Sequence, residues 1–206
     1  MILKQLAVGE LETNCSIMMD EETRACAVVD PGDDAQRILD EIAKLGGKAE
    51  AIFLTHGHFD HMLAAQKVKE ETGAKLYIHK SDLPFMKQYN ARFTKGYRQP
   101  EADAFLEEGM EIKIGGLTVT VLNTPGHSKG SCVLLCEGEM FAGDTLFCHD
   151  CGRWDLPGGS KAEMYRSLKR LHNLPGDYDV YPGHGPFSTL AEERRENPYM
   201  KEALTQ

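Results

Sequence analysis

Hydrophobic and polar positions alternate between strand-like and helix-like patterns along the whole chain. Several short apolar runs are rich in Val, Ile and Leu and are bounded by Gly, Pro, Asp or Asn, which is typical of β-strands. These runs are residues 2–8, 14–20, 25–30, 51–56, 75–79, 111–114, 117–123, 131–138, 139–143 and 177–183.

Helix-like segments lie between and after these runs. Asp33 or Asp34 can cap a helix whose apolar face carries Ile38 and Ile42 and which ends at Gly46. Further helices are predicted at residues 61–72, ended by Gly73, at residues 160–172, at residues 189–204 with an interruption at Asn197-Pro198, and after Asp82-Leu83-Pro84, where Met86, Tyr89, Phe93 and Tyr97 follow at helical spacing.

The order of these elements predicts the fold class. Two strand-rich halves, each closed by helices, imply an α/β protein with two sheets packed face to face and helices on the outside. A chain of 206 residues is long enough to bury one substantial core, and this length fits one domain better than two. We therefore expect residues 1–206 to form a single domain.

The charge and the apolar pattern limit the partners of the chain. With a formal net charge of −9, the chain has no electrostatic reason to prefer nucleic acid or an anionic membrane, although charge alone leaves ribonuclease chemistry open. No apolar run is long enough to span a bilayer, and the first residues lack the apolar core of a signal peptide. We expect a cytoplasmic protein with a small-molecule substrate and no nucleic-acid or membrane partner; the sequence does not indicate its oligomeric state.

The cysteines are expected to be reduced thiols. The chain has 6 of them, an even number that would allow disulfides, but it is long and has no secretory signal. Cys132 and Cys136 lie in a strand-like run, where a free cysteine behaves as a small apolar residue. Cys148 and Cys151 form a CxxC spacing, which alone could indicate redox or zinc chemistry. No second CxxC is present to complete a structural zinc site.

A dense group of metal-binding residue types follows the apolar run at residues 51–54. The segment THGHFDH contains His56, His58, Asp60 and His61. Imidazole and carboxylate are the usual nitrogen and oxygen ligands of zinc and similar divalent ions. The predicted helix from His61 presents its N-terminus to Asp60, where a carboxylate is favoured. The sequence therefore predicts a metal site at this turn.

Three more candidate ligands follow other apolar runs. His127, Asp144 and His184 each come shortly after a predicted strand and next to a glycine. Loops at strand ends commonly carry active sites, because the sheet fixes their geometry. A surface cluster of histidines, the plain alternative, would not recur at the ends of separate strands. Outside this pattern lie His79, His149 and His172, of which His149 is next to the stretch GDTLF.

The number of candidate ligands exceeds the needs of one tetrahedral ion. It suits two divalent ions that share a carboxylate, and Asp144, between the histidine motifs, is the natural bridge. Two ions about 3.5–4 Å apart can generate a hydroxide nucleophile at neutral pH and polarise the attacked group. We expect Zn²⁺, with iron or manganese as alternatives, since His and Asp accept all of these ions. The catalytic role is expected to lie with Asp60, His61 and Asp144.

The combined pattern resembles the metallo-β-lactamase superfamily. Its motifs are HxHxDH at residues 56–61, TPGHS at 124–128, GDT at 143–145 and PGHG at 182–185. The stretches GDTLF, CGRWDLPGG and PGHGPFSTLAEERRENPYM are similar to the short members of the glyoxalase II branch, the hydroxyacylglutathione hydrolases. The resemblance implies an αββα sandwich of two mixed β-sheets. It also implies one metal ion on His56, His58 and His127, a second on Asp60, His61 and His184, and Asp144 as the bridge.

The part of the chain that would bind substrate departs from the longer members of that branch. Those members have a further helical domain, a Lys and a Tyr after the GDT motif, and a Tyr after the last His, all of which contact glutathione. Here the matching stretches are Arg153-Trp154-Asp155 and the Gly185-Pro186 region, and the further domain is absent. Arg153 could bind a substrate carboxylate or form a salt bridge with a neighbouring Asp. Trp154 could line the pocket or pack in the core.

The leading hypothesis is hydrolysis of a small acyl thioester, such as S-lactoylglutathione, by a metal-bridging hydroxide, with one metal stabilising the oxyanion. Glutathione itself is expected to be held weakly. The alternatives are an iron-dependent persulfide dioxygenase, whose members resemble this branch and also carry a CGR-type stretch, a metallo-hydrolase of lactones or phosphoesters, and a non-catalytic metal-binding scaffold. Metal content separates the dioxygenase from the hydrolase, because oxygen chemistry requires redox-active iron.

Overall fold

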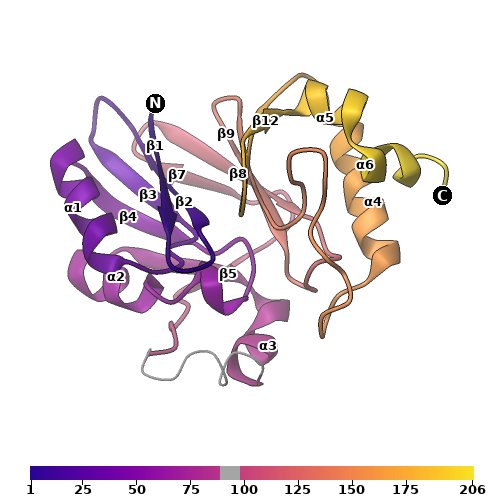
Figure 1. The fold of residues 1–206 in the computed structure, drawn as a ribbon. Coiled ribbons are helices and arrows are strands. Elements are labelled where there is room, and N and C mark those ends of the chain that lie inside the picture. The colour runs from indigo at the N-terminus through magenta and orange to yellow at the C-terminus, as the bar shows by residue number, and fades with distance from the viewer. Residues whose placement is uncertain (89–97) are drawn as a thin grey trace.

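Two six-stranded β-sheets lie face to face, with helices on their outer sides, in the computed structural model of the chain (Figure 1). The structure describes residues 1–88 and 98–206. Both sheets combine parallel and antiparallel neighbours. The predicted αββα sandwich of two mixed sheets is therefore confirmed.

The first sheet contains the strands of the N-terminal half in sequence order. They are β1 (Ile2–Val8), β2 (Thr13–Met19), β3 (Ala25–Val29), β4 (Lys48–Phe53), β5 (Lys75–His79) and β6 (Ala104–Leu106). From β3 to β6 the strands run parallel, so the loops that follow β3 and β4 leave the sheet at the same edge. The helices of this half are α1 (Ala35–Leu45), α2 (Ala65–Thr72) and α3 (Leu83–Gln88).

The second sheet contains the strands of the C-terminal half in reverse order. They are β12 (Ser188–Thr189), β11 (Asp179–Pro182), β10 (Glu139–Gly143), β9 (Cys132–Cys136), β8 (Leu117–Asn123) and β7 (Glu111–Ile114). Only β10 and β11 are parallel, so their carboxyl ends lie side by side. The helices of this half are α4 (Lys161–His172), α5 (Leu190–Glu196) and α6 (Pro198–Ala203).

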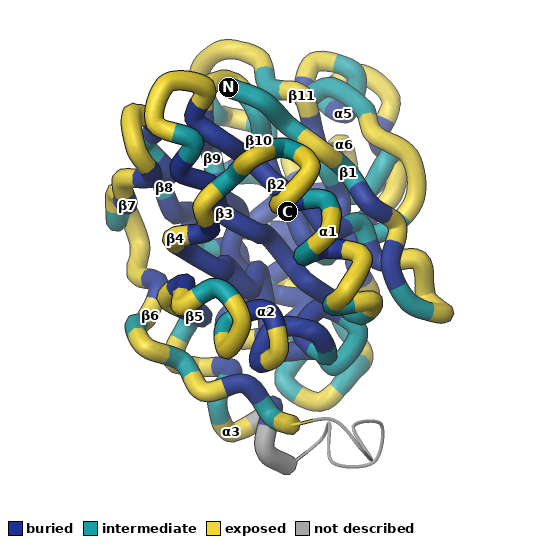
Figure 2. Tube along the Cα trace, turned by 90° about the vertical axis from the view of Figure 1, so that its left-hand side faces the viewer, coloured by how far each residue is buried: buried dark blue, intermediate teal, exposed yellow. Residues whose placement is uncertain are grey.

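The central strands are apolar on both faces because each sheet is covered on both sides. In β3, Ala27 and Val29 pack between the two sheets, whereas Cys26 and Val28 pack beneath the helices. Burying one such side chain stabilises the fold by about 1.5–3 kcal/mol. Figure 2 shows the buried segments as a continuous interior, with the exposed segments on the turns and outer surfaces. This core holds the strand ends, and the loops that leave them, in fixed positions.

Some predicted boundaries were wrong. The helix expected to begin at His61 begins at Ala65, and a separate 3-10 helix, η1 (Phe59–His61), precedes it. Asp60 therefore lies within η1 rather than at the N-terminus of α2. Asp34 occupies the N-cap position of α1 but makes no capping hydrogen bond with its side chain, because its backbone is left-handed with φ 53°.

Other elements were missed or lie outside the described residues. The short strands β6 and β12 were not predicted, since neither has more than a few residues of pattern. Of the predicted stripe after Pro84, Met86 lies in α3, whereas Tyr89, Phe93 and Tyr97 are outside the described residues. None of the helices in the described part of the chain has the length and apolar character needed to cross a membrane.

Candidate metal centre

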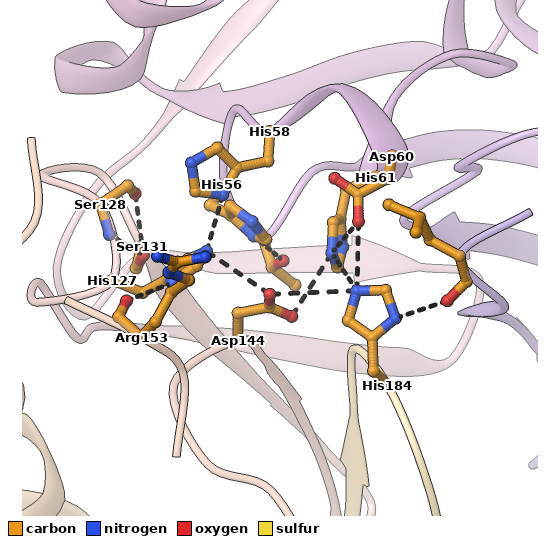
Figure 3. Close-up of polar contacts among 12 residues, drawn as sticks. His56, His58, Asp60, His61, His127, Ser128, Ser131, Asp144, Arg153 and His184 are labelled. Carbon is orange, nitrogen blue, oxygen red and sulfur yellow. Dashed lines mark hydrogen bonds and ion pairs between the residues drawn. The ribbon is translucent and has the colours of Figure 1, made fainter. Parts of the chain in front are cut away.

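The predicted ligands converge where loops of the two sheets meet (Figure 3). His56 and His58 follow β4, and Asp60 and His61 lie in η1. The remaining residues follow three strands of the second sheet, His127 after β8, Asp144 after β10 and His184 after β11. The structure therefore brings together all seven residues that the sequence indicated.

One group of ligand atoms comes from His56, His58 and His127. One ring nitrogen of each lies within 4.8 Å of the others, and Nε2 of His127 is 2.6 Å from Nδ1 of His58. His56 is fully buried, and its Nε2 has no hydrogen-bond partner among the described residues. A buried nitrogen without a partner is unfavourable, so this group fits a divalent cation that would accept the lone pairs.

A second group comes from Asp60, His61 and His184. Their ligand atoms also lie within 4.8 Å of one another. Nε2 of His184 is 3.2 Å from Oδ2 of Asp60 and 3.3 Å from Nε2 of His61. Two imidazole nitrogens and a carboxylate oxygen facing one small space are a suitable donor set for a second ion.

Asp144 lies between the two groups. Its Oδ1 is 3.4 Å from Nε2 of His61, and its Oδ2 is 3.4 Å from Nε2 of His127. The two oxygens thus face different groups, as a bridging carboxylate requires. Glycine is needed beside it, because a Cβ on Gly183 would collide with Oδ1 of Asp144 and with the ring of His61. The donor set as a whole fits two ions that share Asp144.

The electrostatics keep the first group neutral. Burial, reinforced by the neighbouring His61 and His58, holds the pKa of His56 well below its usual value. Burial and the adjacent His127 lower the pKa of His58 to about 3. Both rings are therefore neutral near pH 7, which is the form of imidazole that binds metal ions.

The second group carries the negative charge. Burial opposes the charged form of His61, but Asp144, Asp30 and Asp60 outweigh it and hold the pKa of that imidazole well above its usual value. Burial likewise opposes ionisation of Asp144, but His61 and other rings outweigh it and keep the pKa of this carboxyl well below its usual value. The carboxylates therefore stay ionised, and a cation is the natural counter-charge in so enclosed a space.

Asp30 is a functional residue that the sequence reasoning missed. Its Oδ2 is 2.9 Å from Nδ1 of His61 and accepts a hydrogen bond from the Thr55 hydroxyl. The Thr55 N–H donates to its Oδ1. A carboxylate on Nδ1 orients a ligating imidazole so that Nε2 faces the ion. Its place at the end of an apolar run, before Pro31-Gly32, was the signal, but the sequence reasoning treated it as a turn residue.

Asp82 is a second missed residue, and it connects two of the ligand loops. This buried carboxylate accepts hydrogen bonds from the N–H of Gly57, the N–H of Gly130 and the hydroxyl of Ser128. Gly57 lies between the first two histidines, and Ser128 follows His127. Asp82 therefore fixes the loops that carry the first group. The sequence placed it only at a helix start.

Backbone carbonyls orient the two remaining histidines. Nδ1 of His127 donates to the carbonyl of Arg153 at 2.7 Å, and Nδ1 of His184 donates to the carbonyl of Leu11 at 3.0 Å. Because Nδ1 carries the proton in each ring, Nε2 presents its lone pair to the centre. The loop that contains Arg153 is thus part of the support of the site through its backbone.

A cavity of about 480 Å³ opens onto this centre. Its walls include candidate ligands and apolar side chains, together with one arginine. They are Leu11, His58, Phe59, Asp60, His127, Asp144, Phe147, Cys151, Arg153, Leu156 and His184. A second cavity of about 420 Å³ shares Leu11, Phe59 and Asp60 with it. The centre is therefore accessible to a small molecule with an apolar part.

The two predicted substrate-binding residues differ in position. Arg153 borders the cavity, and its side chain is 62% exposed and forms a two-pronged salt bridge with Asp155 at 2.7 and 2.8 Å. Trp154 packs against Tyr165 and Tyr199 and is not among the described residues that line the cavity. The structure thus gives Arg153 both of the positions that the sequence left open, and gives Trp154 the packing position.

Comparison with known proteins agrees with this geometry. The model of the metallo-β-lactamase superfamily matches residues 8–184. The chain is 31% identical to the hydroxyacylglutathione hydrolase GloC of Haemophilus influenzae, covering 97% of this chain and 98% of that protein. Two solved structures also match. TTHA1623 in a di-iron-bound form has 36% identity and a TM-score of 0.85, with 95% of this chain and 99% of that chain covered. The B3 metallo-β-lactamase BLEG-1 has 30% identity and a TM-score of 0.88, with 97% and 99% covered.

Proposed function

The chain belongs to the metallo-β-lactamase superfamily, and we propose that within this superfamily it is a single-domain, binuclear metal-dependent thioesterase. The proposed substrates are small acyl thioesters, with S-lactoylglutathione as the first to test. We propose zinc as the metal, since His and Asp donors with open positions suit catalytic zinc. A cytoplasmic location is part of the proposal, because all six cysteines are free thiols.

One observation carries the proposal. Asp144 lies between two groups of three ligand atoms, and all of these residues face a cavity or its floor. His56, His58 and His127 would hold one ion, Asp60, His61 and His184 the other, and Asp144 both. Two such ions supply a hydroxide nucleophile at neutral pH and polarise the attacked carbonyl. This is the chemistry that hydrolysis of a thioester needs.

The residues of the chain prepare the site for this chemistry. Asp30 and the backbone carbonyls of Arg153 and Leu11 hold three imidazoles in one orientation, so little rearrangement is needed during the reaction. The apolar walls formed by Phe147 and Leu156 would hold the acyl group and exclude water.

A covalent mechanism through a cysteine is disfavoured. Cys151 is the only cysteine among the described residues of the cavity wall. Burial and the adjacent Asp150 raise the pKa of its thiol to about 12. The thiol is therefore protonated at neutral pH, and a protonated thiol is a poor nucleophile. The proposed nucleophile is hydroxide instead.

The length of the chain is compatible with a glutathione thioester. GloC, named as a hydroxyacylglutathione hydrolase, is matched over 98% of its own length. A protein of this size can therefore carry that activity without the further helical domain of the longer enzymes. How tightly this chain holds the glutathione part is a separate question, which depends on the surroundings of Arg153.

The experiment combines metal analysis with a substrate panel. The purified protein is assayed for zinc, iron and manganese, and then for hydrolysis of S-lactoylglutathione, other acyl thioesters, a lactone, a phosphodiester and a β-lactam. We expect thioesters to be preferred, activity to disappear after chelation, and activity to return with Zn²⁺. The Asp144→Ala variant controls for a contaminating esterase. A fully metal-loaded protein that leaves every thioester intact would overturn the proposal.

Iron supports a second candidate function. TTHA1623, a relative with 36% identity, has been solved in a di-iron-bound form, so a site of this kind can hold redox-active metal. The second candidate is therefore the iron-dependent persulfide dioxygenase, which would consume O₂ and a thiol persulfide and yield sulfite and the thiol. Oxygen uptake by the iron-loaded protein with glutathione persulfide, and none by the zinc-loaded protein, would favour this function over the thioesterase.

A further inference from the structure

We propose that Cys148, His149 and Glu193 form an additional metal site for Zn²⁺ or a similar thiol-binding divalent ion, separate from the candidate metal centre. The sequence drew attention to Cys148 through the CxxC spacing, and the proposed thioesterase activity makes no use of it. The inference is independent of that proposed function, because it rests on other residues and on another ligand chemistry.

The three residues meet through the tertiary fold. Cys148 and His149 form the tip of a tight turn that backbone hydrogen bonds between Phe147 and Asp150 close at 3.0 and 3.2 Å. Glu193 comes from α5, far along the chain. The Cys148 sulfur, a ring nitrogen of His149 and a carboxylate oxygen of Glu193 lie within 4.8 Å of one another. This spacing allows all three to bind one ion.

The carboxylate of Glu193 provides an independent reason to expect a cation. Its side chain is completely buried. Oε2 accepts hydrogen bonds from the N–H of His149 at 2.9 Å and from the Asn197 amide at 2.7 Å. Oε1 is also buried but has no hydrogen-bond partner among the described residues. A buried carboxylate oxygen without a partner is unfavourable, and an ion held with Cys148 would satisfy it.

The donor set indicates the kind of ion. Thiolate, imidazole and carboxylate together are typical ligands of zinc, whereas magnesium and calcium prefer oxygen alone. Burial and the carboxylates of Glu193 and Glu192 raise the pKa of the Cys148 thiol. A divalent ion would reverse this effect and take the thiolate form, with release of a proton. The candidate metal centre, in contrast, offers only nitrogen and oxygen.

His149 has the second partner that ligating imidazoles commonly have. Its Nε2 is 3.0 Å from Oε1 of Glu192, and a carboxylate on one ring nitrogen orients the other toward a metal. We therefore assign Nδ1 as the ligand. An ion at this position would connect α5 to the turn whose flanking residues Phe147 and Cys151 line the cavity. Its role would be to fix that wall.

The test uses metal content and the spectrum of the cobalt-loaded protein. The apoprotein is saturated with Co²⁺ and dialysed, and the variants Cys148→Ser and His149→Ala are treated in parallel. We expect a sulfur-to-cobalt charge-transfer band in the wild type, its loss in Cys148→Ser, and a metal content lower by about one equivalent in both variants. Cys151→Ser is the matched control, because this thiol belongs to the same turn but not to the cluster, and it should keep both the band and the ion.

The outcomes separate this inference from the proposed thioesterase. Asp144→Ala should keep the charge-transfer band even when hydrolysis is lost. If the wild type shows no such band and the same metal content as Cys148→Ser and His149→Ala, the additional site does not exist, whatever the activity of the protein. His149 is partly exposed, so His149→Ala tests the site even where another variant folds poorly.

Discussion

Nδ1 of His61 lies 2.9 Å from Oδ2 of Asp30, and the same carboxylate accepts two hydrogen bonds from Thr55. This relationship joins the end of β3 to the candidate ligands after β4. It fixes the ring of His61 so that Nε2 faces Asp144 and His184. The orientation of this ligand therefore depends on a residue that does not itself need to contact a metal.

We expect Asp30→Asn to weaken the second proposed ion selectively. The amide would lose the negative charge beside His61 and would direct an N–H or a weaker acceptor at Nδ1. Loss of such a partner lowers metal affinity by about 10–100-fold. Competition with a chelator, followed by counting the ions released at each step, measures the change. Asp40→Asn, on the exposed face of α1, is the control, and equal affinities in both variants would contradict the role given to Asp30.

The fold could be predicted from the sequence because its strong signals are local. Residues 25–29 and 139–143 are short apolar runs next to turn residues, and both are strands. Each must be buried on both faces, which leaves few arrangements other than sheets covered by helices. The start of α2 was misplaced because the pattern from His61 is compatible with a helix, whereas η1 directs Asp60 and His61 to the centre.

The proposed ligands could be predicted because each is marked by its type and by a neighbouring glycine at a strand end. Asp30 and Asp82 could not, because a single Asp in a turn has many structural uses. Only the tertiary structure shows that Asp82 contacts the loops of both Gly57 and Gly130. Supporting residues of this kind depend on contacts between distant segments, about which one sequence says little.

Asp144→Ala should remove at least one metal ion and nearly all hydrolysis. Asp144 is the only described carboxylate whose two oxygens face both groups of candidate ligands, so its loss would affect both proposed ions. Metal analysis and a thioester assay measure the effect, with circular dichroism to check the fold. Asp179→Ala, an exposed carboxylate at the start of β11, should keep both properties. A variant at Asp144 with two ions and normal turnover would refute the bridge.

Asp82→Ala should destabilise the fold and the first group of ligands together. It would leave the N–H groups of Gly57 and Gly130 and the hydroxyl of Ser128 without their acceptor. Each buried donor without a partner costs about 1–3 kcal/mol, although water can replace part of this loss. We expect the free energy of unfolding to fall by about 3 kcal/mol in Asp82→Ala and about 1 kcal/mol in Ser128→Ala. Urea denaturation of the metal-free proteins tests this order.

No cysteine should be needed for turnover. Cys151 borders the cavity, but burial keeps its thiol protonated, and the proposed nucleophile is hydroxide. We expect kcat of Cys151→Ser to stay within about threefold of the wild-type value, far from the loss seen when a nucleophile is removed. Alkylation of the partly exposed Cys148 should also leave kcat largely intact. Loss of hydrolysis in a folded, metal-loaded Cys151→Ser protein would require a catalytic thiol.

Arg153 is expected to select acidic thioesters only to a modest degree. Its guanidinium already holds Asp155 through two hydrogen bonds, which lower the pKa of that carboxyl to about 2. A substrate carboxylate must therefore compete with Asp155. A desolvated charge-assisted hydrogen bond contributes about 1.5–3 kcal/mol, but the exposure of Arg153 reduces this to about 1 kcal/mol. Arg153→Ala should then raise KM for S-lactoylglutathione about fivefold and leave kcat nearly unchanged.

The paired variant Asp155→Ala makes this prediction sharper. Removing the competing carboxylate should lower KM for acidic thioesters, whereas a neutral thioester of similar size should respond to neither variant. Arg153→Lys should restore only part of the loss, because an ammonium cannot bind a carboxylate through two parallel hydrogen bonds. Steady-state kinetics on the three variants with the two substrates gives the result. If acidic and neutral substrates lose equally in Arg153→Ala, its role is to hold the loop that supports His127 through the Arg153 carbonyl, and the carrier is recognised elsewhere in the cavity.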